Sequence, residues 1–360
     1  MHKTPLNSWH HSHNGRMVDF AGWEMPVQYS SIVEEHNTVR NAVGLFDISH
    51  MGRLFFRGPM CEGFLNGVLT NDVSKLKVGD VRYSLVCDKN GGILDDVLVY
   101  RMPDRWELVV NASNREKIVN WLEHSAGFAA IEFQDRTLST GMIAVQGPKA
   151  LSLVSELIGS DLTGMKYYSA KDLTYSGTAG IVSRTGYTGE DGFELVTPAV
   201  DAERIWTALM EKGASHGIVA AGLGCRDTLR LEAAMPLYGH ELSQSVDPLT
   251  AGLEFAVKFN KPEFIGKSAL ESIKTSGLTM ARVGLVLDSR RIAREESPVV
   301  IGGAEVGKVT SGTFSPTLQK VIAMAYVPIA SSAVSTKLEV SLRGTLVPAE
   351  VVPLPFYKRP

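Results

Sequence analysis

The sequence is short of cysteine, of long apolar runs and of any surplus of charge. Cys61, Cys87 and Cys225 lie far apart and lack the spacing of a zinc site. This pattern excludes a disulfide framework and favours a reducing compartment. No apolar stretch is long enough to span a membrane, and no signal segment or Arg-rich, Ser-rich presequence opens the chain. We therefore expect a cytoplasmic protein without a membrane partner, or a mature form whose targeting segment is left out of this sequence.

The charge of the chain is nearly balanced. Lys and Arg number 36 against 39 Asp and Glu, for a net charge of -3. Such a balance excludes attachment to nucleic acid by a strong basic field, although local basic patches are compatible with it. The histidines His10, His11 and His13 have no nearby carboxylate or cysteine to complete a ligand set, so we expect a solvated polar segment and no metal.

Length and periodicity predict a multidomain α+β fold, because 360 residues with 44% apolar content can bury more than one core. From Gly58 to about Thr140 the pattern is that of a compact α+β unit, and residues 141 to about 275 return to alternating strands and helices. Residues 279–360 carry short strands separated by turns, which is typical of a small barrel or sandwich, and we expect a barrel.

Several helix signals are specific enough to be tested. The apolar pattern predicts a helix over 32–43 that ends at Gly44, and another over 226–235 that ends at Pro236. Ser113 and Glu116 have the spacing of a capping box, which predicts the start of a further helix.

The stretch Gly91–Tyr100 opens with two glycines and two adjacent carboxylates, followed by an apolar, β-branched run. This composition predicts a strand after a tight turn. Since neighbouring side chains of a strand point to opposite faces, at most one of Asp95 and Asp96 faces a given cleft. The other needs solvent or a partner.

This strand is expected to pair with a following one across a short turn. If Arg101 lies opposite Trp106, then Asp96 falls opposite Asn111. A shift of the turn by one residue puts Asp95 there instead. Sequence leaves both registers open, but either one brings a carboxylate beside an amide.

A glycine-rich stretch at Arg184–Leu195 is the second candidate for a site. It lacks both the Gly-Lys-Ser/Thr ending of a phosphate loop and the helix of a dinucleotide loop, so a tight loop leading into a strand is the simpler interpretation. Phe193 and Leu195 share one face of that strand, and Glu194 points the other way, to solvent or a cleft. A carboxylate there can accept hydrogen bonds from the ring N–H and exocyclic amine of a pterin or purine.

Arg226 and Arg230 lie four residues apart on one predicted helix face, where like charges repel mildly. Each is therefore expected to have an anionic partner. One interpretation is an internal salt-bridge network with Asp227, Glu232 or a distant carboxylate. The other gives Arg226 a carboxylate-bearing or heterocyclic ligand, which suits its planar fork.

The lone histidines His50 and His240 are further candidates, as acid–base groups. A lone histidine is more often a satisfied structural residue.

Six segments, in one order along almost the whole chain, resemble a known family. They are Arg16–Trp23, Phe46–Met51, Gly91–Asp96, Ser183–Leu195, Cys225–Glu232 and Thr310–Leu318. Together they resemble the T-protein (aminomethyltransferase) family of the glycine cleavage system. The resemblance implies a three-domain cloverleaf around a central opening that holds tetrahydrofolate. Residues 1–50 plus 141–278 would form one folate-binding α+β domain, residues 51–140 an inserted α+β domain of ferredoxin-like type, and residues 279–360 the barrel.

The resemblance also implies a reaction and a partner. The family takes an aminomethyl group from the lipoyl arm of H-protein and yields methylene-tetrahydrofolate, ammonia and dihydrolipoyl H-protein. Its essential carboxylate matches Asp96, which would orient the reacting folate nitrogens, accept a proton and stabilise the cationic iminium. The implied folate-binding residues are Met51, Tyr83, Asn111, Tyr187, Glu194, Arg226 and, in the C-terminal tail, Arg359.

Two departures and two alternatives accompany this resemblance. His240 stands where relatives usually carry Gln, and Met235–Pro236 replaces a more typical apolar or aromatic pair. One alternative is a folate-binding paralogue of iron–sulfur cluster maturation, whose Lys-Gly-Cys-Tyr-x-Gly-Gln-Glu signature is replaced here by Pro236–Glu241. The other is a folate-dependent demethylase that acts on a small methylated substrate.

Overall fold

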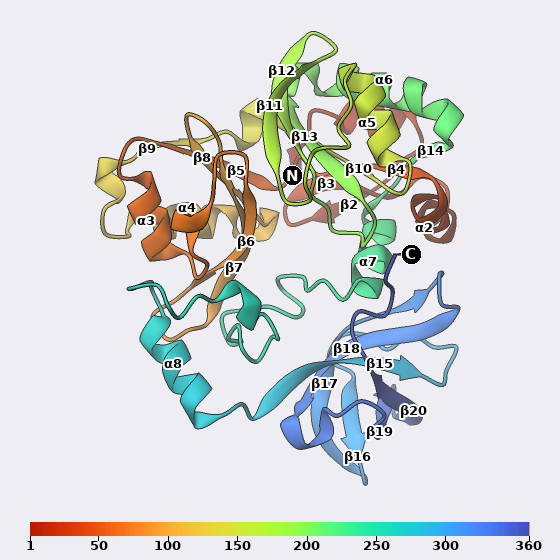
Figure 1. Ribbon diagram of the computed structural model, residues 1–360. Helices are drawn as coiled ribbons and strands as arrows, with labels where there is room; N and C mark the ends of the chain where they lie inside the picture. Colours follow the sequence, from red (N-terminus) through yellow and green to blue (C-terminus); the bar gives the residue numbers. More distant parts are fainter. Residues whose placement is uncertain (360) are drawn as a thin grey trace. The chain divides into compact units, whose positions relative to one another are not determined.

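The computed structural model describes residues 1–359, and the chain divides into two compact units (Figure 1). The first unit comprises Met1–Ser84 and Asp96–Arg226, and the second comprises Leu85–Asp95 and the chain from Asp227 onward. The helices are α1 (Asn7–Ser12), α2 (Ile32–Asn41), α3 (Cys61–Val68), α4 (Arg115–Glu123), α5 (Ala150–Ile158), α6 (Ala202–Gly213), α7 (Leu223–Glu232) and α8 (Lys267–Ser276).

A six-stranded sheet of order β11-β12-β13-β10-β4-β14 forms the centre of the first unit. Its strands are β4 (Val43–Asp47), β10 (Thr140–Gln146), β11 (Ala170–Tyr175), β12 (Thr178–Ser183), β13 (Gly192–Pro198) and β14 (Ile218–Ala220). Helices α5 and α6 cover one face of this sheet (Figure 1), where Phe193, Leu195 and Trp206 are buried in one apolar core. Because Phe193 and Leu195 point into this core, Glu194 between them lies on the other face.

Two smaller sheets accompany it. A three-stranded sheet has the order β1-β3-β2, with β1 (His2–Lys3), β2 (Arg16–Phe20) and β3 (Trp23–Gln28). A five-stranded sheet has the order β6-β7-β8-β5-β9, with β5 (Gly52–Arg57), β6 (Val81–Cys87), β7 (Ile93–Arg101), β8 (Trp106–Val110) and β9 (Glu132–Asp135). In it Arg101 pairs with Trp106 and Leu98 with Val109. Of the two registers left open by the sequence, the structure therefore adopts the one that brings Asp96 to Asn111.

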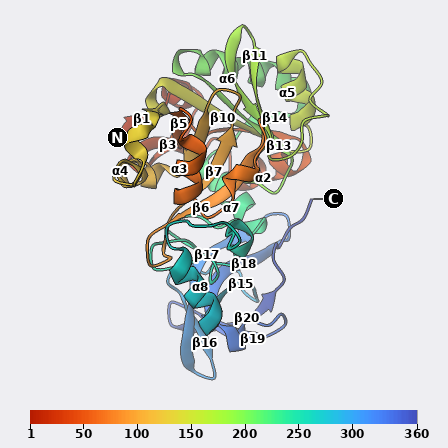
Figure 2. The same ribbon diagram turned by 60° about the vertical axis from the view of Figure 1, so that its left-hand side comes forward.

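The second unit contains a closed barrel of order β15-β18-β17-β16-β19-β20 (Figure 2). Its strands are β15 (Met280–Leu287), β16 (Pro298–Ile301), β17 (Ala304–Ser315), β18 (Lys320–Pro328), β19 (Lys337–Leu342) and β20 (Thr345–Val352). Alternate side chains such as Val283, Leu285 and Leu287 fill its interior. The predicted α+β fold with a C-terminal barrel is confirmed.

Three boundaries predicted from the sequence are wrong. Gly44 lies inside β4 rather than ending α2, and it is needed there because a Cβ at this position would lie 2.4 Å from Val39 Cγ2. Helix α4 begins after a 3₁₀ turn over Ala112–Asn114, so its N-cap is Asn114 and not the predicted capping box. Helix α7 ends at Glu232, and Ala234, with φ of 55°, turns the chain away before Pro236.

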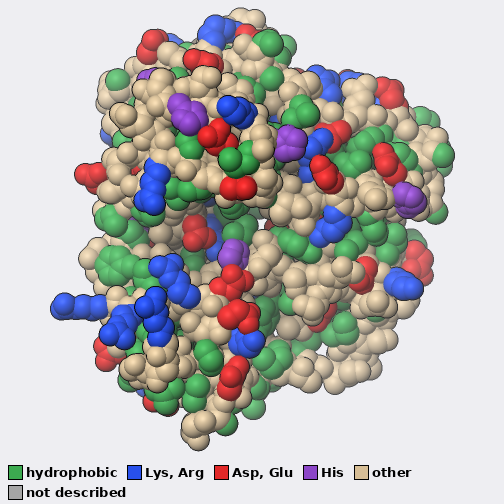
Figure 3. Space-filling model, turned by 180° about the vertical axis from the view of Figure 1, so that it is seen from behind, with side chains coloured by type: hydrophobic (Ala, Val, Ile, Leu, Met, Phe, Trp, Pro, Cys, Tyr) green, Lys and Arg blue, Asp and Glu red, His purple; other side chains and the backbone are tan. Residues whose placement is uncertain are grey.

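The surface agrees with the balanced composition. On the face in Figure 3, Lys and Arg side chains gather in one group, while elsewhere acidic and basic side chains are interspersed. Within residues 1–359, every helix is too short or too polar to cross a membrane.

Candidate functional site

The carboxylate of Asp96, on β7, is held by two side chains of the first unit. Asn111 Nδ2 donates a hydrogen bond to Asp96 Oδ1 at 2.7 Å and another to the Asp96 carbonyl at 3.2 Å, and the Tyr83 hydroxyl donates to Oδ2 at 3.2 Å. Burial raises the pKa of Asp96 to about 6, although the bonds from Asn111 and Tyr83 favour the anion. This carboxyl therefore changes protonation close to neutral pH, as catalytic carboxyls do. Its neighbour Asp95 is fully buried, so of the two alternatives predicted for the second carboxylate, solvent or a partner, the structure excludes solvent.

Glu194, Arg226 and Tyr187 form a second group in the same unit. The Arg226 guanidinium lies 4.9 Å from the centre of the Tyr187 ring, and its Nη1 is buried without a hydrogen-bond partner. Glu194 is 6% exposed and accepts a hydrogen bond from Thr185 Oγ1 at 2.5 Å. Burial raises the pKa of Glu194, and Thr185 and Arg226 oppose that rise. A buried donor and a buried carboxylate together can bind a ligand that offers both an acceptor and donors.

Tyrosines connect these two groups. Tyr83 interacts electrostatically with Asp96, Tyr187 and Tyr168, and Tyr168 interacts with both Asp96 and Glu194. Burial raises the pKa of Tyr168 and that of Tyr83, so both hydroxyls keep their protons at neutral pH. Tyr168 was not among the residues predicted from the sequence. Its backbone adopts φ of 60°, a strained value for a bulky residue of the kind found at functional sites.

His50 and Met51 lie in the turn between β4 and β5. The His50 ring is edge-on to Phe20 at 5.4 Å between centroids, and its Nδ1 is buried without a partner. Burial lowers the pKa of His50 to about 3; Asp47 opposes this, and Arg226 and Arg53 lower it further. Its imidazole is therefore neutral at physiological pH. Met51, next to it, is partly exposed.

The predicted solvated histidine segment is wrong for His10, which is fully buried. His10 Nε2 lies 2.9 Å from Asp47 Oδ2, and its Nδ1 lies 2.8 Å from the Tyr29 hydroxyl. Burial alone would raise the pKa of Asp47, but bonds from His10 and Ser49 outweigh it and hold the pKa at about 2. This network secures the end of β4 just before the turn that carries His50. Among the described residues, no three His, Cys, Asp or Glu side chains are grouped to hold a metal ion.

Arg230 belongs to a salt-bridge network inside the second unit. Its guanidinium reaches Glu241 Oε2 at 2.7 Å, Asp227 Oδ1 at 2.8 Å and Ser311 Oγ at 2.8 Å. The salt-bridge interpretation is therefore correct for Arg230. Arg226 makes no ion pair within the described part of the chain, although the negative charge of Glu194 opposes the lowering of its pKa by burial.

Two other predicted residues lie on the surface of the second unit. His240 Nδ1 is 3.2 Å from Glu295 Oε2. Arg359 is exposed at the end of a tail whose Tyr357 N–H donates to the Glu232 carbonyl at 2.8 Å.

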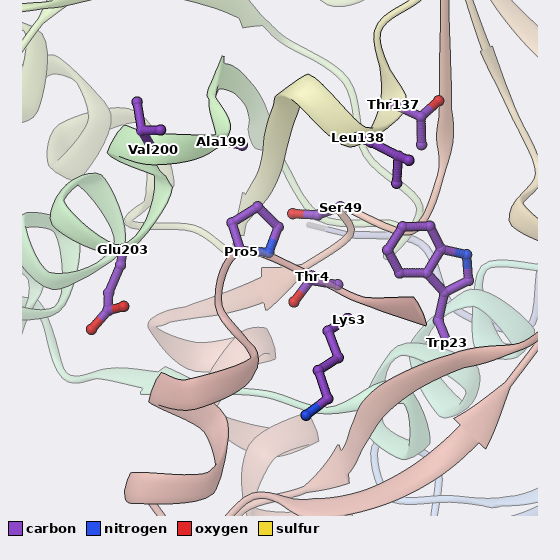
Figure 4. Close-up of a pocket in the computed structure, with 10 residues that line it drawn as sticks. All are labelled: Lys3, Thr4, Pro5, Trp23, Ser49, Thr137, Leu138, Ala199, Val200 and Glu203. Atoms are coloured by element: carbon purple, nitrogen blue, oxygen red, sulfur yellow. The ribbon is translucent and has the colours of Figure 1, made fainter. Parts of the chain in front are cut away.

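A separate hollow of about 450 Å³ opens on the first unit (Figure 4). It is lined by Lys3, Thr4, Pro5, Trp23, Ser49, Thr137, Leu138, Ala199, Val200 and Glu203. The eight site residues predicted from the sequence are not among them.

Comparison with known proteins connects this geometry to a family. Residues 6–261 match the GCVT N-terminal domain, and residues 281–358 match the glycine cleavage T-protein C-terminal barrel domain. An aminomethyltransferase of Symbiobacterium thermophilum is 50% identical over 99% of this chain and 98% of its own. One of Bacillus cereus is 46% identical over 100% of this chain and 99% of its own. The crystal structure of glycine cleavage system aminomethyltransferase T from Bartonella henselae superposes with a TM-score of 0.93 at 32% identity, over 99% of this chain and 98% of that one.

The fold and these relatives define a group-transferring enzyme with an α+β N-terminal region and a C-terminal barrel. The chain belongs to the glycine cleavage T-protein family, and its activity is that of an aminomethyltransferase of the glycine cleavage system. The resemblance stated from the sequence is confirmed.

Proposed function

We propose that the first unit binds tetrahydrofolate and that the chain passes to it the methylene of an aminomethyl group carried by lipoylated H-protein, with release of ammonia. The observation that carries this proposal is the partly buried Asp96 carboxyl, which is held by Asn111 and Tyr83 and whose pKa is raised by burial to about 6. The residues of the first unit proposed to hold the folate are Met51, Tyr83, Asn111, Tyr187, Glu194 and Arg226. The role of Arg359 is proposed on the family resemblance alone.

The residues present suit a reduced pterin. Such a ring system offers N–H and exocyclic amine donors to the Glu194 carboxylate, and acceptor atoms to the Nη1 of Arg226, which lacks a partner. Tyr187, beneath the Arg226 guanidinium, adds a flat aromatic surface. When bound, tetrahydrofolate supplies the nitrogens that receive the methylene group.

Asp96 is the residue assigned to the chemistry. With a pKa of about 6, it is mainly ionised at neutral pH and can accept a proton there. Its negative charge, in buried surroundings, stabilises the positive charge that develops as ammonia leaves. The hydrogen bonds from Asn111 and Tyr83 fix the direction of both carboxylate oxygens, so little reorganisation is needed during the reaction.

The decisive experiment mixes the protein with aminomethyl-loaded, lipoylated H-protein and tetrahydrofolate. We expect ammonia and methylene-tetrahydrofolate to form in equal amounts and to depend on H-protein. Demethylation of a small N-methylated amine without H-protein would instead support the demethylase alternative. Folate binding without turnover of either substrate would support a non-catalytic paralogue.

We also propose a cytoplasmic location, consistent with three cysteines that are all buried and form no disulfide among the described residues. The three-domain division at 1–50 plus 141–278, 51–140 and 279–360, and the cloverleaf arrangement, are proposed on the family resemblance.

A further inference from the structure

Arg53, on β5, is fully buried, yet no carboxylate among the described residues lies within ion-pair distance of it. Burial lowers its pKa to about 10, while Asp47 and Asp135 act on it from a longer range, so it stays charged at neutral pH. A buried charge without an ion partner is costly unless hydrogen bonds replace its water.

All five guanidinium donors of Arg53 are in fact used. Nη1 donates to the carbonyl oxygens of Ser49, at 2.8 Å, and Met51. Nη2 donates to the carbonyl oxygens of Thr137 and, at 2.8 Å, Thr140. Nε donates to the Thr140 hydroxyl at 2.9 Å. A planar, rigid fork therefore joins two backbone segments that are far apart in sequence.

The segment over 49–51 is the turn that carries His50 and Met51. Its two bonded carbonyls flank His50, so the guanidinium sets the direction of both peptide planes of this turn. The turn is followed by Gly52, whose backbone packs closely against the Val110 side chain. A Cβ at this position would lie 2.4 Å from Val110 Cγ2. The other segment, over 137–140, borders the hollow of Figure 4.

We infer that Arg53 is a positioning residue for folate binding, because its guanidinium fixes the 49–51 turn and thereby the place of the Met51 side chain. This inference rests on the proposed role of Met51 as a wall of the folate pocket. Arg53 itself acts only through the turn.

The first test is Arg53→Lys, which keeps the charge but cannot bridge both segments with a single ammonium group. We expect the KM for tetrahydrofolate to rise about tenfold, the scale of one misplaced apolar contact in a binding pocket, with kcat little changed. Arg57→Lys is the matched control, since Arg57 lies on the same strand but pairs at the surface with Asp104 and Glu132. It should leave the KM unchanged.

The second test combines Arg53→Lys with Met51→Ala. If Arg53 acts through Met51, the double variant should have nearly the KM of Met51→Ala alone. Independent multiplication of the two effects would overturn the role of Arg53. An unchanged KM in Met51→Ala alone would instead remove Met51 from the folate pocket, which is the part of the proposed function on which the inference rests. If Arg53→Lys does not fold, Thr140→Val, which removes one acceptor of the clamp, should show a smaller rise with the same dependence on Met51.

Discussion

Replacement of Asp96 by Asn is expected to separate activity from stability. The amide can keep both native contacts, since its oxygen accepts from Asn111 and its nitrogen donates to the Tyr83 oxygen. It cannot accept a proton or carry negative charge, so turnover should fall by about 10² to 10⁴-fold, the range for loss of a general base. Folate binding should be largely retained.

The same substitution should stabilise the first unit at neutral pH. The folded-state pKa of Asp96 is about 6, against an ordinary value of 3.8. Between these two values the folded protein retains a proton that the unfolded chain has released, so stability falls as the pH rises. Above pH 6 the full penalty is present, about 3 kcal/mol as an upper estimate for this difference in pKa. Asn carries no such penalty.

The assay is urea unfolding followed by tryptophan fluorescence. All five tryptophans, Trp9, Trp23, Trp106, Trp121 and Trp206, belong to the first unit, so the signal reports on the unit that contains Asp96. The variant should be more stable than the parent at pH 8 and equal to it below pH 4. Equal stability of the two proteins at pH 8 would refute the argument that burial strains this carboxylate, and near-normal turnover would refute its catalytic role.

Three further predictions use other buried charges. Glu194→Gln should weaken folate binding by about 1.5–3 kcal/mol, the scale of a charge-assisted hydrogen bond, and unchanged affinity in calorimetry would contradict its role. Glu241→Ala should lower the stability of the second unit by about 3 kcal/mol in urea unfolding followed by circular dichroism, because the buried Arg230 loses its buried carboxylate partner and keeps the half-exposed Asp227 as its ion pair; a loss below about 1 kcal/mol would show that Asp227 and water compensate. Asp47, whose pKa is held at about 2, should contribute about 2.5 kcal/mol to the free energy of unfolding above pH 4, and this contribution should be lost as the pH falls towards 2. Asp47→Asn should abolish that dependence in tryptophan fluorescence, and an unaltered acid transition would count against it.

Strands were the best-predicted elements, because alternating apolar side chains bounded by turn residues have few competing interpretations. The strand predicted within Gly91–Tyr100 is present as β7, and the short strands predicted over residues 279–360 are present as β15 to β20. The ends of helices that are set by tertiary contacts were predicted at the wrong residues. Gly44 carries the same signal as a helix terminator, yet its role comes from the Val39 side chain packed against it.

The candidate site was predictable only in part. The predicted hairpin placed either Asp95 or Asp96 opposite Asn111, and only the strand register seen in the structure identifies Asp96 as that residue. Arg226 and Arg230 carry the same local signal, and what packs around each decides that one joins Glu241 while the other lies over Tyr187. The clamp formed by Arg53 has no local signal, because four of its five acceptors are backbone carbonyls and one pair of these lies more than eighty residues away in sequence.

The division into two units has a practical consequence for anyone who wishes to dissect this enzyme. The chain passes from one unit to the other between residues 84 and 85, 95 and 96, and 226 and 227. These crossings fall inside β6, β7 and α7, not in loops. A fragment that starts at residue 227 would lack the strand segments that residues 85–95 contribute, and its counterpart would carry two severed strands. Neither half is therefore suited to separate expression, and truncation series should keep residues 81–101 intact.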